Sequence, residues 1–353
     1  MKRVAATEPD QELEAPAPAV APVLARARAP WLVPLADRLR RMQSQARVPH
    51  GLLLVGAPGG GQAELGLQLA GELLCRGQGA GRCGKCADCA LFEAGTHPDF
   101  AWLRVAPGKK EIAIAQVRSL TEQLSLRSYR GGAKVALVDP AEAMNIHSFN
   151  ALLKTLEEPA DETYLVLATS RADRIPPTIA SRCTRLRVPP AARAEALAWL
   201  AQQEARQGWD ALLALANGAP FLAAEYAAAG LEDLDREMRE AIAGAAGSAA
   251  DLVARARDWA DQAPAARLLW LESWLAGELK AAGLSSDAVN NNRLPWLRGP
   301  GHAMKIQSGY RLLDRLREAR RLAGGSLNMQ LLFEGLLVSI AAFLAEGTQR
   351  VQE

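Results

Sequence analysis

The sequence predicts an α/β fold with a mostly parallel sheet, followed by helical domains. From about residue 31 to residue 188, short continuous apolar runs alternate with segments of helical spacing. Runs of this kind are typical of strands that are buried on both faces by helices. After Pro189-Pro190 the sequence becomes rich in Ala and Leu and has helical spacing throughout. Two successive prolines cannot continue a strand ladder, so the α/β pattern ends there.

The expected elements follow from these runs in chain order. Helical spacing is clear at 64–74 and at 147–158, where Phe149, Leu152, Leu153 and Leu156 share one face. Strands are expected at 51–56, 99–105, 134–139, 163–170 and 184–188.

The chain divides into four expected parts. Residues 1–23 are rich in Ala and Pro without apolar periodicity, which favours a mobile tail. Residues 24–188 form the α/β domain, which carries a cysteine-rich module at 75–89. A small helical domain is expected at 189–245 and a larger one at 246–353, separated by a break near "GAAGSAA".

Composition gives no overall basic signature. The 41 Lys and Arg nearly balance the 39 Asp and Glu among 353 residues, unlike a protein whose main task is to grip nucleic acid. The N-terminus lacks the apolar core of a secretory signal, and the longest apolar run near the C-terminus is too short to span a bilayer. We therefore expect a cytoplasmic protein.

The stretch "GAPGGGQA", residues 56–63, resembles a phosphate-binding loop that lacks two functional residues. Gly56 and Gly61 have the P-loop spacing, and the loop lies between an apolar strand and a helix. In an active loop a lysine contacts the β- and γ-phosphates and a hydroxyl binds Mg²⁺. Gln62 and Ala63 stand at those two positions, so productive binding of Mg-ATP is not expected.

The third expected strand shows a similar loss. It ends in Asp139-Pro140. In an active ATPase of this plan an Asp-Glu pair ends this strand, with the Asp acting on Mg²⁺ and the Glu polarising water. Asp139 is retained, but Pro140 has no group that could polarise water.

Four of the five cysteines form a candidate metal site. Cys75, Cys83, Cys86 and Cys89 have the spacing C-x7-C-x2-C-x2-C. Four sulfur ligands favour a closed, structural zinc site over a catalytic one. An iron–sulfur site or a redox pair fits the same residues. His97 follows the cluster and is expected to be structural, and Cys183 is expected to be a small buried residue.

The stretch 147–183, which contains "NALLKTLEEP", "LATS" and "SRC", resembles the clamp-loader branch of the AAA+ proteins, which includes the bacterial DNA polymerase III gamma/tau and delta-prime subunits. A degenerate P-loop is typical of the delta-prime family. The resemblance implies a RecA-like AAA+ domain with an inserted module that binds structural zinc, a helical lid at 189–245 and an all-α collar at 246–353 that mediates oligomerisation.

The resemblance also implies a role for Ser181, Arg182 and Cys183, which match the family's SRC motif. Its arginine acts as a finger in the ATP site of a neighbouring gamma/tau subunit. The implied function is that of a non-hydrolysing subunit of the polymerase holoenzyme, which works with gamma/tau and delta to load the sliding clamp onto primed DNA. An active gamma-like ATPase and a zinc-dependent DNA-binding module are the alternatives.

Overall fold

The computed structural model describes residues 20–77, 81–106, 109, 111–243, 249–283, 302–323 and 328–348. The chain divides into two compact units, residues 1–191 and 192–353, and the division follows Pro189-Pro190 directly. The first unit contains all five strands of the described chain, and the second contains helices only. A further division of the second unit into lid and collar stays a prediction, since residues 244–248 of the expected break at 244–250 lie outside the described residues.

The first unit is built on a five-stranded sheet in which every neighbouring pair is parallel, with the order β2-β3-β4-β1-β5. The five expected strands are confirmed, each one to three residues shorter than the apolar run that predicted it. They are β1 (Gly51–Val55), β2 (Phe100–Leu103), β3 (Lys134–Val138), β4 (Thr163–Thr169) and β5 (Thr184–Arg187).

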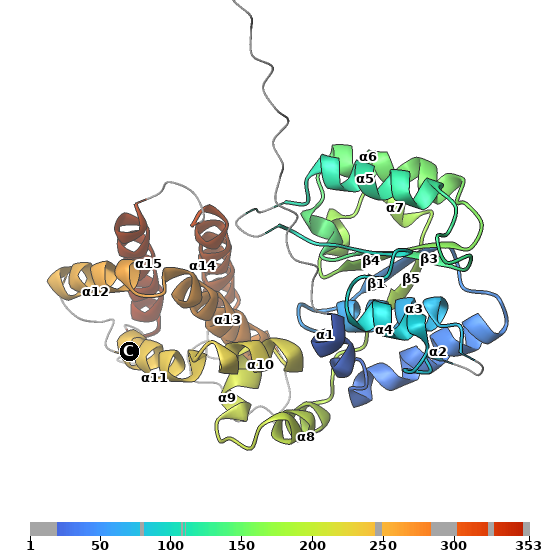
Figure 1. Ribbon diagram of the computed structural model, residues 1–353. Coiled ribbons are helices and arrows are strands. Elements are labelled where there is room, and N and C mark those ends of the chain that lie inside the picture. Colours follow the sequence, from blue (N-terminus) through green and yellow to red (C-terminus); the bar gives the residue numbers. More distant parts are fainter. Residues whose placement is uncertain are drawn as a thin grey trace, which may run out of the picture. The chain divides into compact units, whose positions relative to one another are not determined.

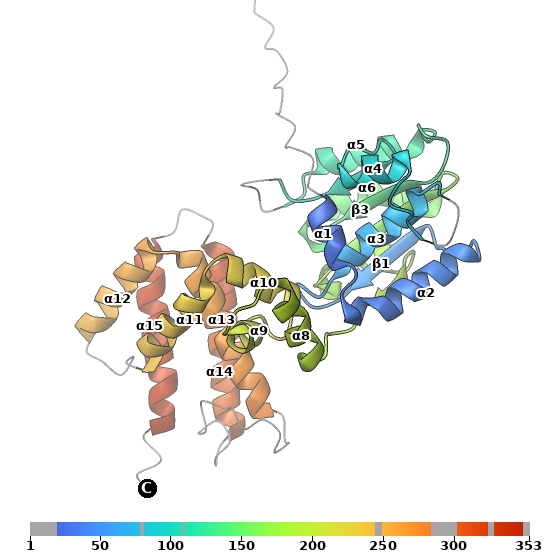
Figure 2. The same cartoon turned by 60° about the horizontal axis from the view of Figure 1, so that its bottom comes forward.

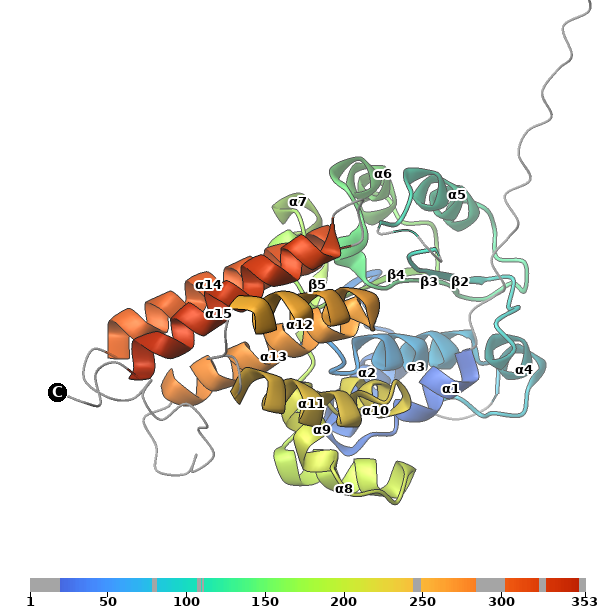
Figure 3. The same cartoon turned by 90° about the vertical axis from the view of Figure 1, so that its left-hand side faces the viewer.

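Helices cover both faces of this sheet, so the unit has three layers (Figures 1 and 3). One layer contains α1 (Val20–Arg26), α2 (Val33–Ser44), α3 (Gln62–Leu74) and α4 (Ala87–Glu93). The other contains α5 (Ile114–Ser125), α6 (Ile146–Glu157) and the short α7 (Pro177–Ala180).

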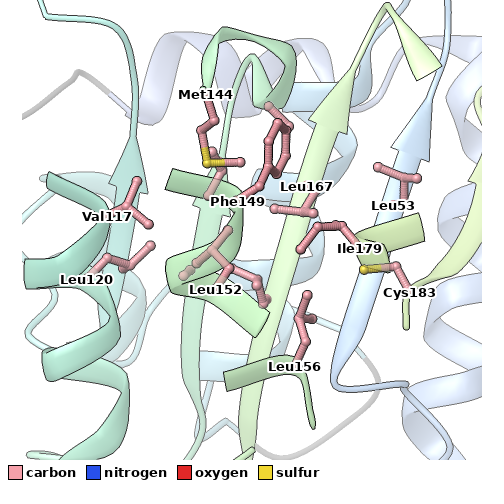
Figure 4. Packing of buried hydrophobic residues seen from close by; sticks show 14 of the residues in the cluster. Leu53, Val117, Leu120, Met144, Phe149, Leu152, Leu156, Leu167, Ile179 and Cys183 are labelled. Atoms are coloured by element: carbon pink, nitrogen blue, oxygen red, sulfur yellow. The ribbon is translucent and has the colours of Figure 1, made fainter. Parts of the chain in front are cut away.

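The core between the sheet and the second helix layer is formed by the apolar face that the sequence predicts for α6. Phe149, Leu152 and Leu156 are at most 2% exposed, whereas Leu153 is only partly buried at the margin. Figure 4 shows these side chains packed against Leu167 of β4 and Leu53 of β1, with Ile179 and Cys183 completing the cluster.

Helix α1 corrects the expected boundary of the N-terminal tail. It begins at Val20, inside the segment 1–23 that composition assigns to a tail. Val20 and Leu24 lie one helical turn apart and are buried, because α1 packs against α3. Residues 1–19 of the expected tail lie outside the described residues.

The second unit consists of helices that bury several tryptophans. Trp259 packs edge-on against Phe333, and Trp270 stacks on Trp274. Helices α13 and α14 run side by side, as do α12 and α15 (Figure 2). The helices are α8 (Arg193–Gln203), α9 (Trp209–Leu215), α10 (Pro220–Ala228), α11 (Leu231–Ala243), α12 (Ala249–Asp261), α13 (Pro264–Gly283), α14 (His302–Leu322) and α15 (Met329–Thr348).

Among the described helices, no single one has the length and apolar composition to cross a membrane. One bent pair of helices, Trp209–Leu215 with Pro220–Ala228, has the length and apolar composition of a membrane span only when the two are taken together.

The core around α6 yields a prediction for stability. Leu152→Ala removes a fully buried side chain and leaves a cavity, so the free energy of unfolding should fall by about 2–5 kcal/mol. Urea denaturation followed by circular dichroism measures the change. Lys154→Ala, at an exposed position of the same helix, is the control and should change stability by less than about 0.5 kcal/mol. Equal stability of the two variants would contradict the packing.

Candidate functional site

The glycine loop joins the end of β1 to the start of α3, as the sequence predicts. Gly59 and Gly61 have φ angles of 67° and 112°, which side chains other than glycine rarely adopt. Gly61 precedes the first residue of α3, so the loop ends at a helix N-terminus, where backbone N–H groups and the helix dipole attract anions. The backbone context of a phosphate-binding loop is therefore present.

The side chain of Gln62 turns back into this loop. It is 7% exposed, and its Nε2 donates to the carbonyl oxygens of Ala57 at 3.0 Å and Thr169 at 3.3 Å. A Cβ atom added at Gly56 would lie 2.9 Å from Cδ of Gln62, so the amide packs directly against the loop backbone. A neutral amide thus fills the inner side of the loop and bonds two carbonyl groups.

Trp31 holds the loop from a segment that precedes β1. It lies in the 3₁₀ turn η1 (Pro30–Leu32), is 4% exposed, and its Nε1 donates to the carbonyl of Gly60 at 3.1 Å. This bond joins residues that are 29 positions apart. The loop is therefore fixed by one side chain from its own helix and by a second from outside it.

Two carboxylates, those of Asp139 and Glu142, follow β3. Burial raises the pKa of Asp139 to about 6, although the charge of Arg104 acts in the opposite direction and Glu142 adds to the rise. Glu142 Oε1 accepts bonds from Ser170 Oγ at 2.6 Å and from Ser170 N at 3.0 Å. Glu142 is thereby tied to the end of β4.

Arg182 lies at the surface between α7 and β5. Its side chain is 37% exposed; Nη2 is 2.6 Å from Oε1 of Glu157, and Nη1 donates to the carbonyl of Thr178 at 2.9 Å. Ser181 Oγ also donates to Thr178, at 3.2 Å. Cys183 points into the core, as expected, and burial raises its pKa to about 11.

Sheet topology places Arg182 and the glycine loop at opposite ends of the parallel strands. The loop follows the end of β1, whereas Arg182 precedes the start of β5, which pairs with β1 in parallel. A five-residue strand spans roughly 16 Å. Gln62 of the loop thus contacts Thr169 at the end of β4. Arg182, in contrast, does not lie near the loop of its own chain.

The four cysteines near α3 and α4 converge. Their Sγ atoms all lie within 4.8 Å of one another, with 4.0 Å between Cys75 and Cys86 and 3.9 Å between Cys83 and Cys89. Four thiolates at 2.3 Å from a tetrahedral Zn²⁺ would be separated by roughly 3.8 Å. The sulfur positions therefore fit one zinc ion.

Backbone N–H groups support the sulfur atoms of this cluster. Cys75 Sγ accepts from the N–H groups of Gly77 and Cys83, each at 3.3 Å. Burial acts to raise the pKa of Cys86, but hydrogen bonds, led by that from the backbone N–H of Cys89, lower it to about 6. Burial raises the pKa of Cys89 to about 12. Such N–H donors stabilise thiolates, the form that binds metal.

His97 lies beside the cluster without joining it. Its Nδ1 accepts from the backbone N–H of Asp99 at 3.1 Å, and its Nε2 is 3.4 Å from Oδ1 of Asp88. Asp88, which is 3% exposed, also accepts a hydrogen bond from Arg130 Nε at 2.8 Å. These contacts agree with the structural role expected for His97 and connect α4 to the turn that precedes β3.

Comparison with known proteins identifies the family. The family described as "DNA polymerase III, delta subunit" matches residues 33–192. The DNA polymerase III subunit delta' of Escherichia coli K12 is 34% identical over 328 residues, which cover 90% of this chain and 96% of that protein. The chain belongs to the delta' family of DNA polymerase III subunits. This confirms the resemblance drawn from residues 147–183.

Other relatives place this delta' family member in the wider clamp-loader group. The delta' subunit of Pseudomonas aeruginosa is 38% identical over 217 residues, which cover 60% of this chain and 65% of that protein. The Escherichia coli tau subunit is 37% identical over 141 residues, 40% of this chain and 22% of that protein. The similarity to tau is therefore confined to a smaller part of the chain.

The cysteine geometry predicts the metal content. Purified protein should contain about one zinc ion per chain, and Cys86→Ser should lose most of it because three sulfur ligands remain. Cys183→Ala, outside the cluster, is the control and should keep its zinc. Elemental analysis by mass spectrometry measures both. Zinc-free wild-type protein after refolding with Zn²⁺, or an unchanged zinc content in Cys86→Ser, would contradict the site.

Asp139 predicts a pH dependence of stability. Its folded-state pKa of about 6 lies above its ordinary value, so the folded state holds a proton that the unfolded state releases near pH 4. This contribution is lost as pH rises through 6. Asp139→Asn should therefore stabilise the protein by about 3 kcal/mol at pH 7.5 and by much less near pH 4. Denaturant titrations at both pH values test this, with exposed Asp161→Asn as the control; a gain that does not depend on pH would count against it.

Proposed function

We propose that this delta' family member is a non-hydrolysing subunit of the DNA polymerase III clamp loader, and that Arg182 acts in the ATP site of a neighbouring gamma/tau subunit. The observation that carries the proposal is the position of Arg182 at the amino ends of the strands, whereas its own glycine loop lies at their carboxyl ends. A guanidinium held there cannot serve a nucleotide in that loop, but it is exposed and available to another chain.

The state of the chain's own loop supports the absence of hydrolysis. The lysine and hydroxyl that hold Mg-ATP are replaced by Gln62 and Ala63. The amide of Gln62 bonds the carbonyl groups of Ala57 and Thr169 and carries no charge that could attract phosphate groups. Pro140 supplies no water-polarising carboxylate, and Glu142 is bonded to Ser170. A gamma-like ATPase is thereby disfavoured.

The contacts of Arg182 suit a group that changes partners. Glu157 and the carbonyl of Thr178 orient the guanidinium, yet the pair is exposed, with side-chain exposures of 37% and 49%. Exposed ion pairs contribute only about 0–1 kcal/mol, so a phosphate group can replace Glu157 at little cost. A guanidinium placed on the charge that develops at the γ-phosphoryl group lowers the barrier by several kcal/mol.

We also propose that Cys75, Cys83, Cys86 and Cys89 hold a structural Zn²⁺. With four protein ligands the ion has no open position for a substrate, so it supplies cross-linking rather than catalysis. The contact of the buried Asp88 with the partly exposed Arg130 ties this module to the rest of the domain. A stable attachment of this kind favours a structural module over a separate zinc-dependent DNA-binding unit.

In this proposal the helical second unit provides the lid and the collar that assembles with gamma/tau and delta subunits. The assembled complex loads the sliding clamp onto primed DNA. The similarity of one part of the chain to the tau subunit supports a shared AAA+ architecture within one assembly.

Arg182→Ala tests the proposed role. In a complex reconstituted with gamma/tau and delta subunits, clamp and primed DNA, hydrolysis at the neighbouring site should fall by about 10³-fold or more, because the transition-state charge loses its donor. Single-turnover ATP hydrolysis, in a complex whose other ATP sites lack the P-loop lysine, measures the chemical step at that site. Arg185→Ala, an exposed arginine on β5, is the matched control and should leave the rate unchanged.

Normal hydrolysis in an assembled Arg182→Ala complex would refute the role of Arg182. Magnesium-dependent turnover by the isolated chain, at the rate of gamma/tau subunits, would refute the non-hydrolysing assignment.

A further inference from the structure

A small cleft opens in the first unit near the amino ends of β2 and β3, at the end of the strands opposite the glycine loop. It has a volume of about 170 Å³ and lies between the start of β2, the end of α5 and the turn that follows α5. Its walls include Phe100, Leu124, Leu126 and Tyr129, and Lys134 lies among its lining residues. None of these residues belongs to the glycine loop, the cysteine cluster or the surroundings of Arg182.

Lys134 provides a charged group inside the cleft. The residue is only 5% exposed, and its ammonium group donates to the carbonyl oxygens of Leu124 and Leu126 at the end of α5. An ammonium group has three N–H donors, so these two carbonyls leave one donor available. Burial lowers the pKa of Lys134, because the charged form is poorly solvated there. An acceptor supplied by a ligand would relieve that cost.

The acidic residue of the cleft is engaged by the neighbouring turn. Asp99 Oδ1 accepts from the backbone N–H of Tyr129 at 2.7 Å, and its Oδ2 accepts from Arg130 N at 2.8 Å and Ser128 Oγ at 2.9 Å. The exposed side chain of Arg127 adds positive charge at the rim. The cleft therefore favours an anionic group over a cationic one.

Two large apolar side chains stand exposed at its entrance. Leu126 is 65% exposed and Tyr129 is 84% exposed, and both line the cleft. The backbone of Tyr129 is fixed by Asp99, so its ring is presented from an ordered turn. Tyrosine and arginine are enriched at protein interfaces, where a few such residues carry most of the binding energy.

The neighbouring strand also leaves one side open. Among the strands that the structure describes, β2 pairs only with β3, and it lies at the edge of the sheet (Figure 3). Edge strands can accept an extended peptide, whose side chains then enter adjacent pockets. The cleft volume of about 170 Å³ is well below the roughly 300 Å³ of small-molecule sites, which points to a single side chain as its occupant.

We propose that this cleft binds a peptide segment of a partner protein in which a large apolar residue is followed by an acidic one. The apolar side chain enters between Leu124, Leu126 and Tyr129, and the carboxylate accepts from Lys134 and Arg127. This site is independent of the proposed action of Arg182.

The test uses the full-length chain and peptides of the form acetyl-Gly-X-Asp-Gly-amide, in which X is Phe, Trp or Leu. Isothermal titration and amide NMR shifts measure binding. At least one peptide should bind saturably, with shifts confined to β2, the start of β3, the end of α5 and residues 126–130. Replacing Asp of the peptide by Asn should weaken binding about fivefold to tenfold, since a charge-assisted hydrogen bond is lost.

Two variants of the protein locate the site. Tyr129→Ala, at an exposed position, should weaken binding about tenfold without affecting the fold. Lys134→Met should abolish the preference for Asp over Asn, and its circular dichroism and unfolding curve establish that it is folded. If Lys134→Met does not fold, Arg127→Ala serves instead and should reduce the same preference. Exposed Arg118→Ala, earlier on α5, is the control.

Absence of saturable binding by all three peptides at millimolar concentrations would overturn the proposal. Equal affinity of wild type and Tyr129→Ala, or of the Asp and Asn peptides, would overturn it as well.

Discussion

The parallel arrangement of the sheet is the constraint on which the site depends. Because β1 and β5 run in the same direction side by side, the residues that follow β1 and those that precede β5 are separated by the length of a strand. One polypeptide thus carries a phosphate-type loop at the carboxyl ends of the strands and an exposed arginine at their amino ends. The two features can act on the same nucleotide only when they come from different chains.

Several features of the fold and site could be predicted because their signals are local. The strands could be predicted from their continuous apolar runs, because a strand buried on both sheet faces has apolar residues throughout. The helix at 147–158 could be predicted from its apolar periodicity alone. The four cysteines were recognisable from their spacing. The loss of lysine and hydroxyl in the glycine loop was visible at Gln62 and Ala63.

Other features could not be predicted because they depend on contacts between distant segments. The bond from Gln62 to Thr169 joins residues 107 positions apart, and Trp31 reaches Gly60 across 29. The ion pair of Glu157 with Arg182 depends on how α6 and α7 pack. Helix α1 was missed because its Ala- and Pro-rich sequence hides an apolar pair, Val20 and Leu24, that is buried against α3 only in the folded chain.

The amide of Gln62 has a thermodynamic consequence. A ligand that binds only the folded state stabilises it in proportion to the logarithm of the ligand concentration. The stability of a domain with an empty ligand site therefore changes with the supply of ligand. Here the amide of Gln62 is covalently part of the chain, and its bonds to the carbonyls of Ala57 and Thr169 are present in every folded molecule. These bonds stabilise the loop without any ligand.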